Sequence, residues 1–366
     1  MIGKDDIIIR KTILHVLDTI HGDCILSNTL LDPGPDLYEF IRTHIFKIFT
    51  SDDTKKCTFY EEKSPIYPLL SSWDEKEDSS FIETSQEIAQ KLYYAMHEGP
   101  DIPPADLLFV SFQAESIIYL ALLKMNYKES YTHQIAIFES PESEVLSAEE
   151  EYPEMKQDLP EEEPVTLIHA DIVKSKALLP AASSRIPEAV IINLSDLSIQ
   201  LLEKRYEVNG EKVDYLSENF LVCHTNLPAK KKLNILTRVV NNITNKYEDA
   251  DMMAKMKVKS ALQKTYLDQK QFDIEEIGQK LFGKSPERKA EFDEKMESYD
   301  LQYDTFSVTN ESTLKNLEKQ VMVTDSGIEI SIPMDTFNKV GCLEIKTDSS
   351  GKSTIIIKDI DNLIVK

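Results

Sequence analysis

The stretch LLFVSFQAESIIYLALLKM, residues 107–125, contains two runs rich in β-branched, aromatic and leucine side chains, separated by Gln113, Ala114 and Glu115. Two such runs joined by a short polar segment predict a β-hairpin. The run THQIAIF, residues 132–138, follows and extends the pattern to a meander. We therefore expect an antiparallel sheet in the N-terminal part of the chain.

The segments around this hairpin predict further strands and two helices. Strand-like runs occur at residues 6–17, 166–173 and 189–194. Apolar residues recur on one helical face over residues 37–49, and Thr84 begins a capping-box pattern for a helix that closes near residue 97. These elements predict a mixed helix and antiparallel-sheet domain over residues 1–200.

The composition changes after residue 200. Helical spacing with few strand formers begins at DLSIQLLEKRY, residues 196–206, and predicts a helical region over residues 201–300. The last part, residues 301–366, shows period-two alternation at 327–333 and a hairpin pattern that joins 342–347 to 353–360. We therefore expect an α+β protein with three domains, of which the last is a small β unit.

The overall charge excludes one class of function. Of 366 residues, 41 are Lys or Arg and 64 are Asp or Glu, so the formal net charge is −23, which excludes a uniformly basic nucleic-acid binder. The start of the chain lacks a signal-peptide apolar region, and no later run is long enough to span a membrane. The four cysteines form no CxxC pair, which argues against a zinc site or a disulfide framework. We expect a cytoplasmic protein without membrane contact.

Two segments depart from this average charge in opposite directions. Residues 138–163 carry eleven carboxylates against Lys156 alone, which favours a solvated, mobile loop; the alternative is an acidic arm that mimics phosphate or binds a basic partner. Residues 228–270 carry ten basic and four acidic residues. Lysines along a helix can follow a phosphate backbone, although a solvated helix face has the same composition. The candidate DNA-binding residues are Lys230, Lys231, Lys232, Arg238, Lys246, Lys255, Lys257, Lys259 and Lys264.

One segment matches a nucleotide-binding motif. Residues 278–285, GQKLFGKS, fit the P-loop pattern, but acidic residues with helical spacing precede them where a buried strand is required. We interpret the segment instead as a helix that ends at Gly283, followed by a helix capped by Ser285 with Pro286 at its first position. No histidine or cysteine spacing matches a metal site, and no catalytic signature is present. We therefore expect neither a cofactor nor enzymatic activity.

The order and the residue patterns of several segments resemble those of the bacterial nucleoid-associated protein family across roughly residues 6–340. The resemblance implies a non-enzymatic DNA-binding protein of the cytoplasmic nucleoid that is acidic overall and forms a homodimer. The hypothesis is backbone contact with double-stranded DNA through the basic segment, with little sequence preference; the alternative is an acidic adaptor that binds a basic DNA-processing protein. The segments that carry the resemblance are SNTLLDPGPDLYEFIRTHIFKIF (27–49), FVSFQAESIIYLALLKM (109–125), HADIVKSKAL (169–178), AVIINL (189–194), YLSENFLVCHTNLPAKKKLNILTRVVNNI (215–243) and FDIEEIGQKLFGKSPERKAEFDEKM (272–296).

Overall fold

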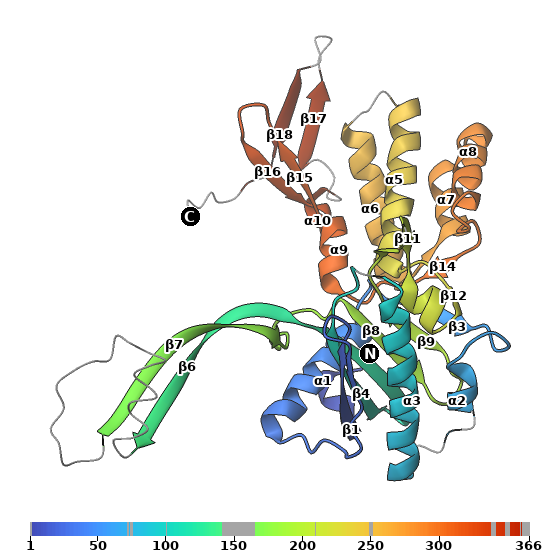
Figure 1. The fold of residues 1–366 in the computed structure, drawn as a ribbon. Helices are drawn as coiled ribbons and strands as arrows, with labels where there is room; N and C mark the ends of the chain where they lie inside the picture. The colour runs from blue at the N-terminus through green and yellow to red at the C-terminus, as the bar shows by residue number, and fades with distance from the viewer. Residues whose placement is uncertain are drawn as a thin grey trace.

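The computed structural model describes most of the chain (Figure 1). The segment predicted as an acidic loop, residues 138–163, lies outside the described residues from residue 141 onward. The described residues are 2–71, 73, 76–99, 101–140, 165–208, 210–248, 252–337, 342–347, 352–358 and 360.

An eight-stranded antiparallel sheet forms the N-terminal part, in the order β12-β3-β9-β8-β5-β4-β1-β2. The predicted hairpin is confirmed: β4 and β5 are joined by a two-residue turn in which Glu115 has a left-handed φ of 56°. The predicted strands at 6–17 and 189–194 are confirmed as β1 and β8. The strands are β1 (Ile7–Asp18), β2 (Asp23–Ile25), β3 (Lys55–Phe59), β4 (Ala105–Ala114), β5 (Ile117–Asn126), β8 (Glu188–Asn193), β9 (Ile199–Leu202) and β12 (Cys223–Thr225).

Helices cover both faces of this sheet (Figure 1). Helix α3 (Asp78–His97) packs on one face with Leu107 and Phe109 of β4 in its core, whereas α1 (Pro35–Phe49) packs on the other face with Leu108 and Val110. Alternate residues of a strand point to opposite faces, so a strand covered on both sides is mostly apolar and buried along its length, as β4 is. The α+β class is therefore confirmed. Two short helical segments, η1 (Lys4–Asp6) and α2 (Tyr67–Ser71), flank these layers.

Two local predictions are wrong in this part. Helix α3 begins at Asp78 with Glu77 at its N-cap, so Thr84 lies inside the helix and does not cap it. Residues 196–206 were expected to be helical, but Ile199–Leu202 form strand β9, in which Ile199 and Leu201 are buried and alternate with half-buried neighbours. Three apolar residues among four fit both the helical and the strand period, and pairing with β3 and β8 selects the strand.

The predicted meander is also wrong at its third strand. Strand β6 (Lys128–Ser140) pairs with β7 (Val165–Leu178) and not with β5, whose free side is taken by β8. The two strands form a separate antiparallel ribbon that projects away from the body (Figure 1). We call this ribbon the arm.

The predicted helical region over residues 201–300 is found only from Ala229 onward; before it, residues 206–225 form short strands and a short helical segment that pack into the core of the sheet domain, so that part of the prediction is wrong. Helices α5 (Ala229–Tyr247), α6 (Met252–Gln269), α7 (Ile274–Phe282) and α8 (Pro286–Glu297) surround a second core, to which the expected stripe of α5 contributes Leu236, Val240 and Ile243. Smaller elements join it to the sheet: β10 (Tyr206–Val208), β11 (Glu211–Val213), η3 (Leu216–Phe220), β13 (Phe272–Asp273) and β14 (Thr305–Phe306).

The C-terminal part contains two small hairpins next to α6. The predicted hairpin is confirmed as β17 (Leu343–Thr347) with β18 (Ser353–Ile357), and the predicted strand at 327–333 is confirmed as β16 (Glu329–Pro333), which pairs with β15 (Lys319–Val323). Helices α9 (Glu311–Glu318) and α10 (Met334–Phe337) connect these strands to the helical part.

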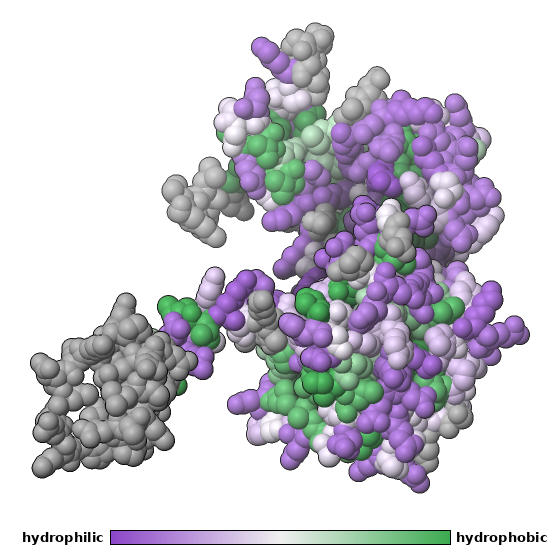
Figure 2. All heavy atoms as spheres, in the orientation of Figure 1, coloured by the Kyte–Doolittle hydropathy of each residue, from purple (hydrophilic) through white to green (hydrophobic). Residues whose placement is uncertain are grey.

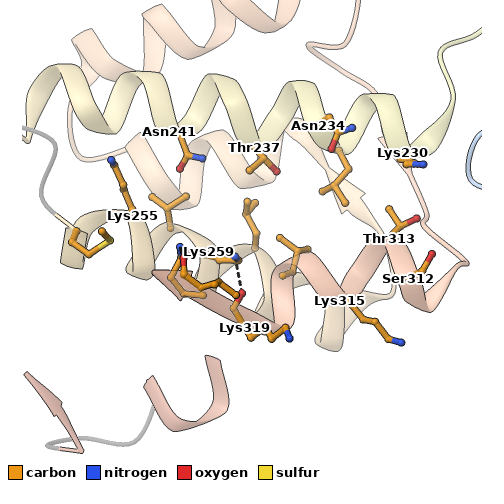
Figure 3. A pocket seen from close by; sticks show the side chains of 17 residues that line it. Lys230, Asn234, Thr237, Asn241, Lys255, Lys259, Ser312, Thr313, Lys315 and Lys319 are labelled. Atoms are coloured by element: carbon orange, nitrogen blue, oxygen red, sulfur yellow. Dashed lines mark hydrogen bonds between the residues drawn. The ribbon is translucent and has the colours of Figure 1, made fainter. Parts of the chain in front are cut away.

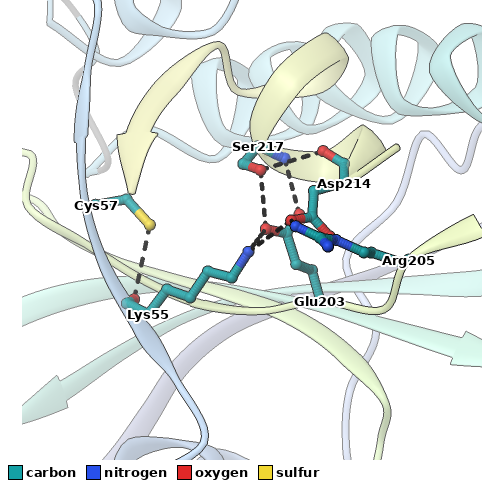
Figure 4. Close-up of polar contacts among 6 residues, drawn as sticks. All are labelled: Lys55, Cys57, Glu203, Arg205, Asp214 and Ser217. Carbon is teal, nitrogen blue, oxygen red and sulfur yellow. Dashed lines mark hydrogen bonds and ion pairs between the residues drawn. The ribbon is translucent and has the colours of Figure 1, made fainter. Parts of the chain in front are cut away.

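A buried polar cluster holds the edge of the sheet in place (Figure 4). The Lys55 ammonium lies 2.7 Å from Glu203 Oε1 and 2.9 Å from Asp214 Oδ2, and the Ser217 hydroxyl donates to Glu203 at 2.8 Å. Burial opposes the charge on Lys55, but the two carboxylates outweigh it and raise the pKa of Lys55. Arg205 Nε lies 3.1 Å from Asp214 Oδ1, so this carboxylate pairs with a second cation. The cluster ties β3, β9 and η3 together, which is a structural role.

Candidate nucleic-acid interface

A groove of about 720 Å³ lies between α5, α6, α9 and the start of β15 (Figure 3). Among the described residues that line it, none is acidic, although the whole chain has a net charge of −23. Its floor is apolar, with Leu233, Val258 and Leu262 among the lining residues. Its charged lining consists of Lys230, Lys255, Lys259, Lys315 and Lys319.

Helix α5 supplies one wall of the groove. Pro228 stands at the N-cap, and the apolar stripe of the helix faces the second core. The opposite stripe, spaced at intervals of three and four residues, therefore faces the groove with Lys230, Asn234, Thr237 and Asn241 (Figure 3). This wall offers one cation and three neutral hydrogen-bonding side chains.

Helix α6 contributes two lysines one turn apart. Lys255 and Lys259 both line the groove. The Lys259 ammonium donates to the Lys319 carbonyl oxygen at 2.9 Å and to Gln320 Oε1 at 3.2 Å, which fixes its position (Figure 3). Burial lowers the pKa of Lys259, so a bound anion would favour its charged form.

Helix α9 closes the groove, and Asp52 holds that helix in place. The buried Asp52 carboxylate accepts hydrogen bonds from the backbone N–H of Thr309 at 2.8 Å and of Asn310 at 2.9 Å. The Asn310 side chain in turn accepts from Ser312 N at 2.9 Å and caps the helix. A residue in the turn between α1 and β3 thereby positions Lys315 on the far side of the groove.

The lysines of the groove differ in their partners. Lys230 pairs with Asp53 at 2.9 Å, outside the lining. Lys255, Lys315 and Lys319 make no ion pair with any residue that the structure describes. The first turn of α9, with Ser312 and Thr313 in the lining, adds the positive end of a helix dipole. The potential of this surface favours an anion, because like charges gather there without a carboxylate between them.

The predicted DNA-binding residues divide into two groups. Lys230, Lys255 and Lys259 come together in the groove, whereas the others lie outside its lining. Lys231, Lys257 and Lys264 are exposed on other surfaces of the same two helices. A role of any of these residues in DNA binding stays a prediction.

Three of the predicted residues are engaged by side chains outside the groove. Lys232 pairs with Asp304 at 2.6 Å, and Lys246 pairs with Glu291 at 2.7 Å. Arg238 donates to the Tyr299 hydroxyl at 3.0 Å and lies over its ring. These cations are therefore less available to an external anion than those of the groove.

Two groove residues were not predicted, Lys315 and Lys319. They lie beyond the basic segment, and Glu311 and Glu318 in the same stretch cancel their charge along the sequence. No local spacing signals them together, because Lys315 lies in α9 whereas Lys319 begins strand β15 with an extended backbone. Only the fold brings both lysines opposite α6.

The nucleotide-binding match at residues 278–285 lies in helix α7 and at its end. The Asp273 side chain caps α7 by accepting from Glu276 N at 2.9 Å. A Cβ at Gly278 would lie 2.6 Å from the ring of Phe292 in α8, so the glycine permits close helix packing. Ser285 stands at the N-cap of α8 with Pro286 following. The prediction of two successive helices in place of a P-loop is confirmed.

Comparisons with known proteins agree with the resemblance seen in the sequence. Within the described residues, no helix is long and apolar enough to cross a bilayer, and no three His, Cys, Asp or Glu side chains cluster as a metal would require. No curated protein matches the chain. The model of a family described as nucleoid-associated protein YejK matches residues 13–364, nearly the whole chain. The chain therefore belongs to the nucleoid-associated protein YejK family.

Proposed function

We propose that this protein binds DNA directly, without enzymatic activity, in the cytoplasmic nucleoid, and that the groove between α5, α6 and α9 contacts the phosphate backbone. The observation that carries the proposal is the acid-free lining with five lysines in a chain of net charge −23. Family membership supports association with the nucleoid. Each lysine that neutralises a phosphate releases a condensed counterion, which makes the binding strongly salt-dependent.

The lining favours duplex DNA over single strands. Proteins that hold single strands stack the bases on aromatic rings, and none of the described lining residues is aromatic. The lining residues are lysines, small polar side chains and aliphatic side chains, which can contact phosphate and sugar from outside an intact duplex.

The same lining supports binding with little sequence preference. Direct readout of base edges relies most often on arginine paired with guanine, and no described lining residue is an arginine. Asn234 and Asn241 are the groups best suited to contact a base. Their position on the α5 wall, among lysines, equally suits hydrogen bonds to phosphate oxygens.

A salt titration with two matched variants tests the proposal. One variant carries Lys255→Gln, Lys315→Gln and Lys319→Gln in the groove; the control carries Lys231→Gln, Lys257→Gln and Lys264→Gln outside it. Both lose three positive charges from exposed or half-buried positions of the helical and C-terminal parts. Binding of a fluorescent duplex by the purified protein is measured by anisotropy at several salt concentrations.

We expect the slope of log affinity against log salt to decrease in magnitude by about 2.7 for the groove variant, since each phosphate contact contributes about 0.9. The control should keep a slope close to that of the native protein. Equal slopes for the two variants would contradict the groove assignment. Absence of any binding by the purified native protein would contradict direct contact and favour the adaptor alternative, in which a basic DNA-processing protein carries the association.

A further inference from the structure

Arg185 stands beside one end of the groove, in the loop that joins the arm to the sheet. This loop covers residues 179–187, between Leu178 at the end of β7 and Glu188 at the start of β8 (Figure 1). The Arg185 side chain is 70% exposed, so its guanidinium can reach a ligand on the surface. The loop belongs to the sheet part of the chain, whereas the groove belongs to the helical and C-terminal parts.

A shared carboxylate places Arg185 next to the groove. Asp53 Oδ2 accepts a hydrogen bond from Lys230 Nζ at 3.1 Å and from Arg185 Nη1 at 3.3 Å. The two nitrogen atoms cannot lie farther apart than the sum of these distances, about 6.4 Å. Lys230 lines the groove. Arg185 therefore places a second cation directly beside the first, just outside the lining.

The backbone next to Arg185 is held by the body of the protein. The Lys47 ammonium of α1 donates to the carbonyl oxygens of Ala182 at 2.7 Å and of Ser183 at 3.1 Å. On the other side of the arginine, Ile186 is buried in the core under α1. The loop therefore presents a fixed backbone, and only the long side chain of Arg185 has to turn to meet a ligand.

The contact with Asp53 holds Arg185 only weakly. The Asp53 side chain is 36% exposed and also pairs with Lys230, and ion pairs between exposed side chains contribute little to stability. Hydrophilic side chains prevail along the boundary between the helical part and the sheet on the visible face (Figure 2). A nucleic acid can therefore replace the carboxylate at Arg185 without uncovering an apolar surface.

The distance between Arg185 and Lys230 matches the scale of a duplex minor groove. The minor groove of B-DNA is about 6 Å wide, whereas the major groove is about 12 Å wide. A duplex whose phosphates contact Lys230 thus has its minor groove within reach of Arg185. A-tracts have a narrow minor groove with an enhanced negative potential, which attracts cationic side chains inserted into it.

A guanidinium suits this position better than an ammonium. It is planar and more weakly hydrated, so it gives up less hydration when it enters a narrow groove. The charged residues in the described lining of the groove are all lysines, which bind phosphate as compact, strongly hydrated charges. Arg185 therefore adds a chemical group that the groove itself does not contain.

We propose that Arg185 enters the minor groove of the duplex whose backbone lies between α5, α6 and α9, and that it gives this protein a preference for DNA with a narrow minor groove. The inference rests on the proposed function, because the lysines of the groove must first bind the backbone. The preference is for the shape of the duplex, so it requires no hydrogen bonds to specific base edges.

Two duplexes of the same base composition test the proposal. Both have identical flanks, and the centre is AAATTT in one and TTTAAA in the other; the first forms a narrow minor groove, and the second is interrupted by a flexible TA step. Affinities are measured by fluorescence anisotropy for the native protein, Arg185→Lys and a control, Arg205→Lys. Arg205 is also an exposed arginine paired with a carboxylate, with a side chain 63% exposed and 3.1 Å from Asp214. Both substitutions keep the net charge, and circular dichroism verifies the fold.

We expect the native protein and Arg205→Lys to bind AAATTT about fivefold more tightly than TTTAAA, since a contact between exposed charges contributes up to about 1 kcal/mol. Arg185→Lys should bind both duplexes with nearly equal affinity and keep the native salt slope, because its charge is retained. Equal affinities for the native protein, or a native ratio in Arg185→Lys, would overturn the inference. So would an equal loss of preference in Arg205→Lys.

The salt titration of the groove variant separates this inference from the proposed function. A native protein that binds both duplexes equally, with a salt slope that still depends on Lys255, Lys315 and Lys319, overturns the role of Arg185 and leaves the groove assignment in place. A native protein that binds neither duplex overturns both.

Discussion

Asp52, between α1 and β3, connects the sheet domain to the groove across more than 250 residues of sequence. Its carboxylate accepts from the backbone N–H of Thr309 and Asn310, immediately before α9, and also from the Thr309 hydroxyl at 3.0 Å. Asp52→Ala removes these acceptors and leaves two backbone N–H groups without their partner. Each hydrogen bond to a charged group contributes about 1.5–3 kcal/mol, and water that enters the exposed site returns part of it. We expect the opening free energy of this segment to fall by about 3 kcal/mol.

Native-state hydrogen exchange measures this change residue by residue. A loss of about 3 kcal/mol corresponds to roughly 150-fold faster exchange at Thr309, Asn310 and the first turn of α9. DNA affinity should fall as well, because α9 carries Lys315 into the groove. Amides in β4 and β5 report whether the sheet remains intact.

The neighbouring residue supplies the control. Asp53 pairs with Lys230 at 2.9 Å and with Arg185 at 3.3 Å, and it forms no hydrogen bond or ion pair with the described residues of the α9 segment. Asp53→Ala changes the net charge by the same amount and should leave exchange at 309–310 unaltered while it frees Lys230 for phosphate. Unchanged exchange in Asp52→Ala, or equal acceleration in both variants, would refute the role assigned to Asp52.

Two further predictions concern buried charge in the sheet. Lys124 and Glu188 form an ion pair at 3.0 Å, with side chains 2% and 0% exposed. Lys124→Met should lower the free energy of unfolding in urea by about 3–5 kcal/mol, because it leaves the buried Glu188 charge without its partner, and adding Glu188→Gln should restore most of that loss. A double variant that does not regain stability would count against this explanation. His15 is buried, its Nδ1 accepts from Ser27 N at 3.1 Å, and burial lowers its pKa to about 4 from 6.5. Between these pH values only the unfolded chain binds the proton at His15, so His15 alone should contribute a fall of about 3 kcal/mol in the free energy of unfolding as the pH falls to about 4. The buried His44, whose pKa is also lowered to about 4, contributes over the same range, so His15→Gln should make the curve shallower by about that amount, and an unchanged curve would contradict it.

Local periodicity was sufficient for the elements whose partners are close in sequence. The β4–β5 hairpin and the apolar stripe of α5 were predicted because a turn or a single helix face specifies them. The arm could not be predicted, since the alternation of residues 132–138 suits a meander and an isolated ribbon equally. Its true partner, β7, begins at Val165, beyond a long acidic segment. Whether β6 pairs with β5 or with the distant β7 depends on which strand occupies the free side of β5, and in the fold β8 occupies it.

The candidate site shows the same division. Lys230, Lys255 and Lys259 were found because they lie in a segment with a positive sum of charges. Lys315 was missed because summation along the chain mixes its charge with that of Glu311, whereas folding directs the two to different surroundings. Conversely, Lys232 and Lys246 contribute to the sum but are paired with carboxylates from distant segments. Net charge per segment therefore indicates a region and does not identify a surface.

Lysine footprinting tests most directly whether the groove binds duplex DNA. The native protein is acetylated briefly with and without a saturating duplex, and modification at each lysine is measured by mass spectrometry. The account predicts protection of Lys255, Lys315 and Lys319 by DNA, with unchanged labelling of Lys231, Lys257 and Lys264 in the same molecules. Protection of the second set, or uniform labelling of both sets under conditions where DNA is bound, would contradict the assignment of the groove as the DNA-binding surface.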